Sequence, residues 1–122
     1  MLNKDGVSKT KLAGPRQILA NVDIQASVGC VVSQDLGVAV GSKKIAKAGT
    51  PIAVDFANLT TPVTAGDAAN AVLLHDVDVT SGAANGTALY LGVVNINRLE
   101  SDVQAKVTAG VNTIGAVTFI KA

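Results

Sequence analysis

The chain has 122 residues, of which 48% are hydrophobic, which suffices for one domain with its own core but hardly for two. Only Phe56, Tyr90 and Phe119 are aromatic, so the composition excludes a core built on large rings and offers no platform for stacking nucleic-acid bases. The net charge is +1, with seven basic and three acidic residues in 1–47 and three basic and six acidic residues in 48–122. This balance argues against a nucleic-acid partner.

Two further features of the sequence bear on where the protein is made and on the role of its cysteine. Residues 1–20 lack the apolar core of about seven residues that a secretion signal needs, and no run approaches the ~18 apolar residues of a membrane span. Cys30 is the single cysteine and lies in the mostly apolar run 28–32, so we interpret it as a small buried hydrophobe and not as a nucleophile. The sequence therefore predicts a protein made in a cytoplasm, with no membrane partner.

The first 20 residues are predicted to form an extended N-terminal arm. Gly6, Gly14 and Pro15 interrupt this segment, basic residues predominate, and its apolar residues follow no sustained period. We expect the arm to be ordered only against a partner. Residues 21–122 are then expected to form a single β-rich domain.

The first half of the domain shows short alternations of apolar and polar residues, which predict strands. The expected strands are 21–25, 28–32, 36–41 and 52–56. Gly49 and Pro51 predict a turn over 48–51, and residues 58–67, with Pro62 and Gly66, predict a loop.

A hairpin is predicted in the second half. Residues 71–80 form the clearest strand, in which Val77 and Val79 share one face and Asp76 and Asp78 the other. The following segment ends in Asn85-Gly86, a dipeptide typical of tight turns, and a strand that is apolar on both faces follows over 88–94.

One helix is predicted, over residues 97–107. Leu99, Val103 and Val107 repeat every four residues and form one apolar stripe, and Asn97 with Glu100 has the spacing of a capping box. A last strand is expected over 114–120. The predicted fold class is therefore mainly β with one short α-helix, in a small domain resembling a β-barrel or β-sandwich.

The sequence offers little material for catalysis. His75, the only histidine, lies beside Asp76 and near Asp78, but neighbouring strand residues point to opposite faces, so the histidine and Asp76 do not easily converge on a metal ion. Neither a nucleophile elbow nor a glycine-rich phosphate-binding motif is present. We therefore predict no enzyme activity and assign no catalytic, cofactor-binding or metal-binding residue.

Several segments of the second half resemble head decoration and head fibre proteins of tailed bacteriophages and, more distantly, the lambda-type decoration fold. The segments that carry this resemblance are 48–51 (AGTP), 71–80 (AVLLHDVDVT), 92–95 (GVVN) and 117–120 (VTFI), with the short helix between the last two. The resemblance implies a structural virion protein that binds the outer surface of the expanded capsid and stabilises it, often as a trimer. The implied partner is the major capsid protein.

In such proteins an N-terminal arm commonly reaches the shell. The residues expected to contact the capsid are therefore the bases of the arm, Lys4, Lys9, Lys11 and Arg16. Docking by the arm and docking by the body of the domain both remain open. Two other hypotheses are the base domain of a head fibre or adhesin that binds a host or glycan surface, and a metal protein or small enzyme built on His75, Asp76 and Asp78.

Overall fold

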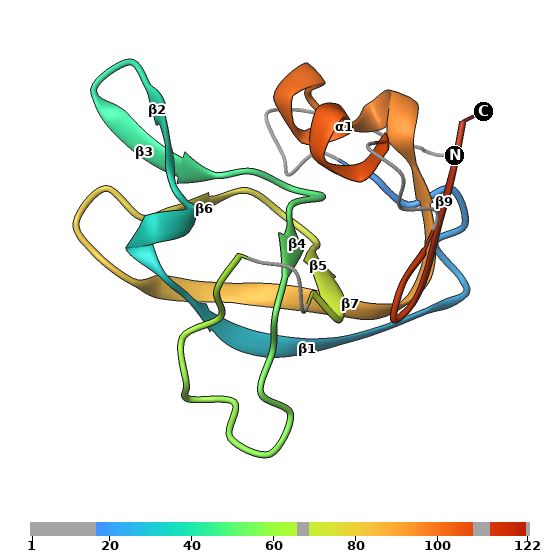
Figure 1. Cartoon of the computed structure of the whole chain (residues 1–122), viewed down its shortest axis with the longest axis horizontal. Coiled ribbons are helices and arrows are strands. Elements are labelled where there is room, and N and C mark those ends of the chain that lie inside the picture. Colours follow the sequence, from blue (N-terminus) through green and yellow to red (C-terminus); the bar gives the residue numbers. More distant parts are fainter. Residues whose placement is uncertain (1–16, 66–68, 109–112, 122) are drawn as a thin grey trace, which may run out of the picture.

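A long central strand, β7 (Ala84–Asn95), organises the fold (Figure 1). The structure is a computed structural model and describes residues 17–65, 69–108 and 113–121. β1 (Gln25–Val32) pairs antiparallel with one edge of β7. The other edge is shared by β5 (Ala71–Leu73), which is antiparallel, and β9 (Ala116–Ile120), which is parallel. Two short strands extend this sheet beyond β5 and β9, namely β4 (Pro51–Ile52) and β8 (Thr113–Ile114).

A second, smaller sheet lies against the central one. It contains β2 (Val38–Val40), β3 (Lys43–Ala46) and β6 (Val77–Asp78), all antiparallel, with β3 in the middle. A short 3-10 helix, η2 (Gln34–Leu36), links β1 to this sheet. The expected mainly β domain with one short helix is thereby confirmed. The two sheets remain separate and do not close into a barrel.

The connection from β7 to the parallel strand β9 contains the helix. It begins with a 3-10 turn, η3 (Ile96–Arg98), and continues into α1 (Ser101–Thr108), so the helix is shorter than the predicted 97–107. Asn95 caps the 3-10 turn, because its side chain accepts a hydrogen bond from the backbone N–H of Asn97. Asn97 lies inside this turn and α1 begins only at Ser101, so the predicted helix start at Asn97 is wrong. The predicted apolar stripe is confirmed, since its three members are buried: Leu99, Val103 and Val107.

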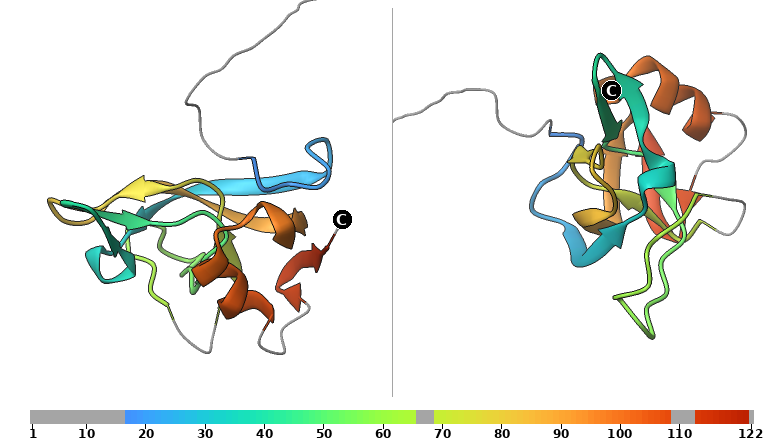
Figure 2. Two further views of the ribbon diagram at one scale, coloured as in Figure 1. Left: turned by 90° about the horizontal axis from the view of Figure 1, so that it is seen from above. Right: turned by 90° about the vertical axis from the view of Figure 1, so that its left-hand side faces the viewer.

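The two faces of the central sheet bury separate cores. Val72 pairs with Leu89, and both belong to the core beneath α1. Their neighbours Leu73 and Ala88 also pair, but they belong to the core shared with the second sheet. Successive strand residues point to opposite faces, so this short apolar stretch supplies both cores. Figure 2 shows α1 and the β2–β3 hairpin as separate parts of the fold.

Several predicted boundaries change in the folded chain. Residues 71–80 form two strands, because β5 ends at Leu73 and the chain crosses at His75 to the second sheet, where β6 begins at Val77. Val77 and Val79 are buried as predicted. The predicted strand 52–56 is reduced to its first residue, and 21–25 contains no strand before Gln25.

The Asn85-Gly86 turn prediction is wrong. Both residues lie inside β7, and the chain turns before Ala84 instead. Gly86 serves close packing, because a Cβ atom there would lie 2.6 Å from Val32 Cγ2. The last predicted strand is divided by a real turn at Gly115, whose φ of 59° lies in the left-handed region.

Part of the segment predicted as an arm packs against the domain. Ile18 and Leu19 are 0% and 2% exposed. The N–H of Asn95 donates to the Ile18 carbonyl (2.9 Å), and the N–H of Ala20 donates to the Val93 carbonyl (2.9 Å). Residues 18–20 therefore continue, beyond a short excursion at 21–24, the same edge of β7 that β1 occupies.

Candidate protein-binding surface

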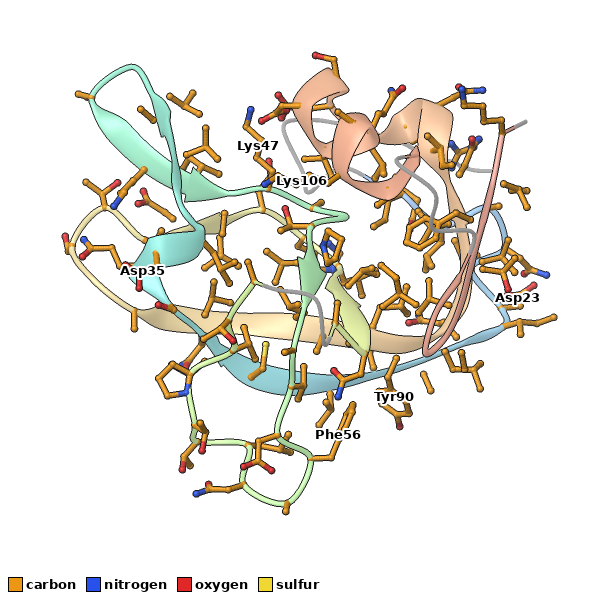
Figure 3. The ribbon with its side chains drawn as sticks, in the orientation of Figure 1. Asp23, Asp35, Lys47, Phe56, Tyr90 and Lys106 are labelled. Carbon is orange, nitrogen blue, oxygen red and sulfur yellow. The ribbon has the colours of Figure 1, made fainter. Side chains whose placement is uncertain are left out.

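Exposed apolar side chains gather where β1 and β7 meet. Tyr90 and Leu91 are consecutive residues of β7, yet they are 38% and 40% exposed. Phe56, from the 53–70 connection, is 48% exposed and contacts Tyr90 edge to face, with ring centroids 5.6 Å apart. Figure 3 shows these two rings side by side. Ile24, just before β1, is 57% exposed.

A β-bulge explains why two successive residues of β7 reach solvent. Leu89 lies opposite Ser27 and Leu91 opposite Ala26, so Tyr90 is an extra residue with no partner on β1. A bulge bends the strand and breaks the alternation of its side chains. Gly92 follows with a φ of 154°, a conformation that favours glycine. The bulge therefore presents Tyr90 and Leu91 together on the surface.

The parallel strand β9 enlarges this surface. Leu91 lies beside Ala116 and Val93 beside Thr118 in the register of β7 and β9. Val117 and Phe119, which alternate with them, belong to the core beneath α1, so Ala116, Thr118 and Ile120 point to the other face. We call the apolar members of this region the open face; they are Ile24, Phe56, Tyr90, Leu91 and Ile120.

Acidic residues border β1 on this side of the molecule. Asp23 precedes the strand, Asp35 follows it in η2, and Asp55 precedes Phe56. Residues 17–42 contain no lysine or arginine. Figure 3 places Asp23 and Asp35 near opposite ends of the strand.

The acidic residues of the predicted motif 75–78 have structural contacts. Asp76 Oδ1 accepts a hydrogen bond from the N–H of Ala48 (2.8 Å), which ties the β3–β4 turn to the crossing segment. Asp78 Oδ1 accepts from the Thr80 N–H (2.9 Å), and hydrogen bonds with Thr80 lower the pKa of Asp78. Within the described residues, no three histidine, cysteine or acidic side chains form a group suited to a metal ion.

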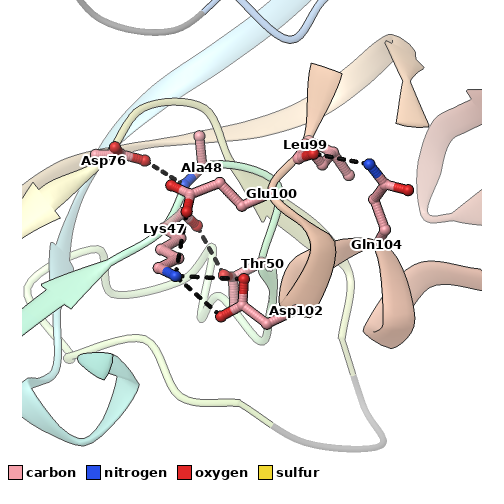
Figure 4. Close-up of polar contacts among 8 residues, drawn as sticks. All are labelled: Lys47, Ala48, Thr50, Asp76, Leu99, Glu100, Asp102 and Gln104. Carbon is pink, nitrogen blue, oxygen red and sulfur yellow. Dashed lines mark hydrogen bonds and ion pairs between the residues drawn. The ribbon is translucent and has the colours of Figure 1, made fainter. Parts of the chain in front are cut away.

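A second polar cluster joins the turn after β3 to α1 (Figure 4). Lys47 Nζ lies 3.1 Å from Asp102 Oδ2 and 3.3 Å from Glu100 Oε1. Hydrogen bonding with Asp102 is the main cause that raises the pKa of Lys47, and the same contact lowers the pKa of Asp102. Thr50 Oγ1 donates to the Lys47 carbonyl (2.7 Å) and closes the turn. We interpret this cluster as a structural link between two elements.

The remaining predicted residues add no reactive group. Cys30 is buried, and burial raises the pKa of its thiol, which disfavours the nucleophilic thiolate. The four predicted capsid contacts, Lys4, Lys9, Lys11 and Arg16, lie outside the described residues. Sequence analysis missed Tyr90 and Leu91 as surface residues, because the run 88–94 looks buried on both sides unless the bulge is known.

No family model matches the chain, and no curated protein matches it. In the part of the chain that the structure describes, no helix has the length and apolar character needed to cross a bilayer.

Proposed function

We propose that this is a structural virion protein that binds the outer surface of a phage capsid and stabilises the shell. The observation that carries the binding part of this proposal is the open face. Tyr90 and Leu91 of β7 and Ile120 of β9 are exposed on the central sheet, and the exposed Ile24 and Phe56 come from adjoining segments. Exposed aromatic and aliphatic clusters of this kind commonly mark protein-binding sites.

The rigidity of the surface supports docking to a preformed partner. The open face is held by a bulged pair of long strands, and the buried residues behind it include Leu89 and Val94, both 0% exposed. A preorganised surface loses little conformational entropy on binding. Its exposed apolar area suits another protein better than a small polar substrate.

The capsid as partner rests on the resemblance of residues 48–51, 71–80, 92–95 and 117–120 to head decoration and head fibre proteins. The proposed partner is the major capsid protein. A ligand that binds only the assembled shell stabilises it by mass action, and many copies multiply a modest contact energy. A homotrimer and an arm that adds contacts through Lys4, Lys9, Lys11 and Arg16 are further parts of the proposal.

Cosedimentation with phage heads tests the function. The full-length protein should bind expanded heads, and the bound heads should resist heating better than bare ones. The double substitution Tyr90→Thr and Leu91→Thr should weaken binding about tenfold or more, because it removes apolar contacts at the centre of the surface. Threonine is β-branched and suits a strand position, so the fold is retained.

A matched control comes from the second sheet. Val40 is 48% exposed but lies in β2, away from the open face, so Val40→Thr should bind heads as the unchanged protein does. Failure of the protein to bind any head would contradict the proposed function. If Val40→Thr weakened head binding as much as the double variant does, the open face would be excluded as the surface that contacts the capsid. Binding to host cells or glycans without binding to heads would favour a fibre or adhesin base.

A further inference from the structure

The second sheet ends in an uncharged strand edge on the β2–β3 hairpin. β2 stands at one end of the strand order β2–β3–β6, and within the described residues no strand pairs with its outer edge. The strand consists of Val38, Ala39 and Val40, so it lacks the lysine or proline that commonly blocks such an edge. Figure 1 shows the hairpin extending from the body of the fold. As far as the described residues go, this edge is available to an added strand.

The hydrogen bonds of β3 show which backbone groups this edge offers. The Lys44 carbonyl accepts from the Val79 N–H (2.9 Å), and the Lys44 N–H donates to Thr80 Oγ1 (2.8 Å), so both groups face β6. In an antiparallel pair, the residue opposite such a position turns its own N–H and C=O away from the partner strand. Ala39 lies opposite Lys44. The N–H and C=O of Ala39 therefore point outward from the edge of the sheet.

Apolar side chains beside this edge share the outer face of the second sheet. Ala46 and its partner Val77 are buried in the core between the two sheets, so Ile45, the residue before Ala46, points to the other face. Val38 lies opposite Ile45, and Val40 follows on the same face with an exposed fraction of 48%. A strand added to β2 would therefore meet two valines on this face.

A second copy of this chain fits the edge because β2 is complementary to itself. When two copies of β2 run antiparallel about Ala39, the two Ala39 residues form a hydrogen-bonded pair, and Val38 of each copy lies opposite Val40 of the other. Cross-strand pairs of β-branched side chains stabilise a sheet. The two three-stranded sheets then join into one continuous sheet with an apolar row on its outer face.

The charges near β2 suit this two-fold arrangement. Residue 37 lies opposite residue 41 of the second copy in this register, so the exposed Asp35 of one copy and the exposed Lys43 of the other lie at the same end of the strand pair. Opposite charges across an interface favour association and help to fix its register. The two Lys44 residues are three strand spacings apart, about 14 Å at ~4.8 Å per strand, which exceeds the screening length of about 8 Å at physiological salt. Their repulsion is therefore weak.

We propose that the outer edge of β2 pairs with the same edge of a second copy of this chain, antiparallel and centred on Ala39. The strand has only three residues, so the contact is weak between free molecules and becomes effective where copies are held close together. A two-fold contact closes after two copies, so it differs from the contact that would form the proposed homotrimer. It uses a different part of the molecule from the open face and does not depend on the proposed capsid function.

Cysteine cross-linking tests the register in the full-length chain carrying Cys30→Ala. In the proposed pair, the Cα atoms of the two Ala39 residues lie about 5.5 Å apart, within the range that a disulfide spans. Ala39→Cys should therefore give a disulfide-linked dimer under mild oxidation. Val38→Cys alone and Val40→Cys alone should cross-link about tenfold more slowly, because each residue lies about 8 Å from its equivalent in the second copy.

Two matched comparisons complete the test. A mixture of Val38→Cys chains and Val40→Cys chains should form the mixed dimer much faster than either variant links to itself, because these residues lie opposite one another, with Cα atoms about 4.5 Å apart. Sedimentation of chains without added cysteines should show an average mass that rises with protein concentration. Ala39→Pro removes only an outward N–H, which an edge strand tolerates, and should abolish this rise. Ala39→Thr keeps the N–H and should retain the rise.

Three results would overturn the proposal. If Ala39→Cys and the mixture cross-linked no faster than Val38→Cys alone, the dimers would come from random collisions of exposed cysteines. If the Ala39 amide exchanged slowly with solvent in a dilute sample whose copies are separate, the edge would be covered within one molecule. An undiminished rise in mass for Ala39→Pro would assign the association to another surface. The binding of phage heads is measured separately, so its failure would count only against the capsid function.

Discussion

Asp76 provides a sharp test of whether the acidic motif is structural. The side chain of Asp76 is exposed, but its hydrogen-bond partner is the backbone N–H of Ala48, a residue that is only 2% exposed. Asp76→Ala removes this charged acceptor and leaves a largely buried donor without its partner. Such a loss costs about 1 to 2 kcal/mol of unfolding free energy. For a chain of this size, that lowers Tm by about 3 to 10 °C.

Two matched variants separate this contact from the general effect of charge. Asp76→Asn retains an acceptor oxygen, so it should lose about half as much stability as Asp76→Ala. Asp78 accepts from the exposed Thr80 N–H within its own turn, and Asp78→Ala should cost about 0.5 kcal/mol or less. Urea unfolding followed by circular dichroism measures all three free energies under the same conditions.

If Asp76→Ala and Asp78→Ala lowered the unfolding free energy equally, the special structural role of the Asp76 contact would be refuted. A metal hypothesis makes a different prediction, since a bound ion would stabilise the protein and its removal would lower Tm. Addition of EDTA to the unchanged protein should leave Tm as it is. A fall of several degrees that calcium or zinc reverses would reinstate His75, Asp76 and Asp78 as candidate ligands.

Two further predictions concern the turn between β8 and β9 and the ionic contact between Lys47 and Asp102. Gly115→Ala should lower the unfolding free energy by about 2 to 4 kcal/mol, because the residue has a φ of 59° and its Cβ would lie 2.6 Å from the carbonyl oxygen of Asn70. The control Gly29→Ala, with no atom within 4 Å of its Cβ, should change the unfolding free energy by about 0.5 kcal/mol or less. The pKa of Asp102 is lowered from its ordinary value of 3.8, so this group stabilises the fold above pH 3.8, and the stabilisation is lost as the pH falls through the pKa of the folded state. The pKa of Lys47 is raised from its ordinary value of 10.5, so this group stabilises the fold below pH 10.5, and the stabilisation is lost as the pH rises through the pKa of the folded state. Lys47→Met should therefore differ most from the unchanged protein in urea unfolding at pH 7 and less at pH 3 and pH 11, and a constant difference at all three values would contradict the ionic contribution.

The local chemistry of the chain explains why its fold class was predictable. Alternation of Val77 and Val79 with Asp76 and Asp78 places the valines inside wherever the segment pairs, because strand side chains alternate between faces. The stripe of Leu99, Val103 and Val107 likewise requires a buried helix face. These patterns depend on neighbours a few residues apart, and they hold in the structure.

The candidate surface could not be predicted in the same way. Tyr90 and Leu91 lie in an apolar run of the sequence. The bulge that exposes them arises only when β7 pairs with β1, which lies some 60 residues earlier in the chain. Phe56 gains its place beside Tyr90 through the path of a loop.

Residue types and their spacing thus define a valine-rich β domain with one helix, a buried cysteine and a basic N-terminal segment. Long-range pairing decides the rest. It divides 71–80 between two sheets at His75, buries Ile18 and Leu19 inside the predicted arm, and turns Asn85-Gly86 from a turn into the middle of a strand. Backbone hydrogen bonds between distant segments carry little local sequence signal, since every residue has a carbonyl acceptor and every residue except proline an N–H donor.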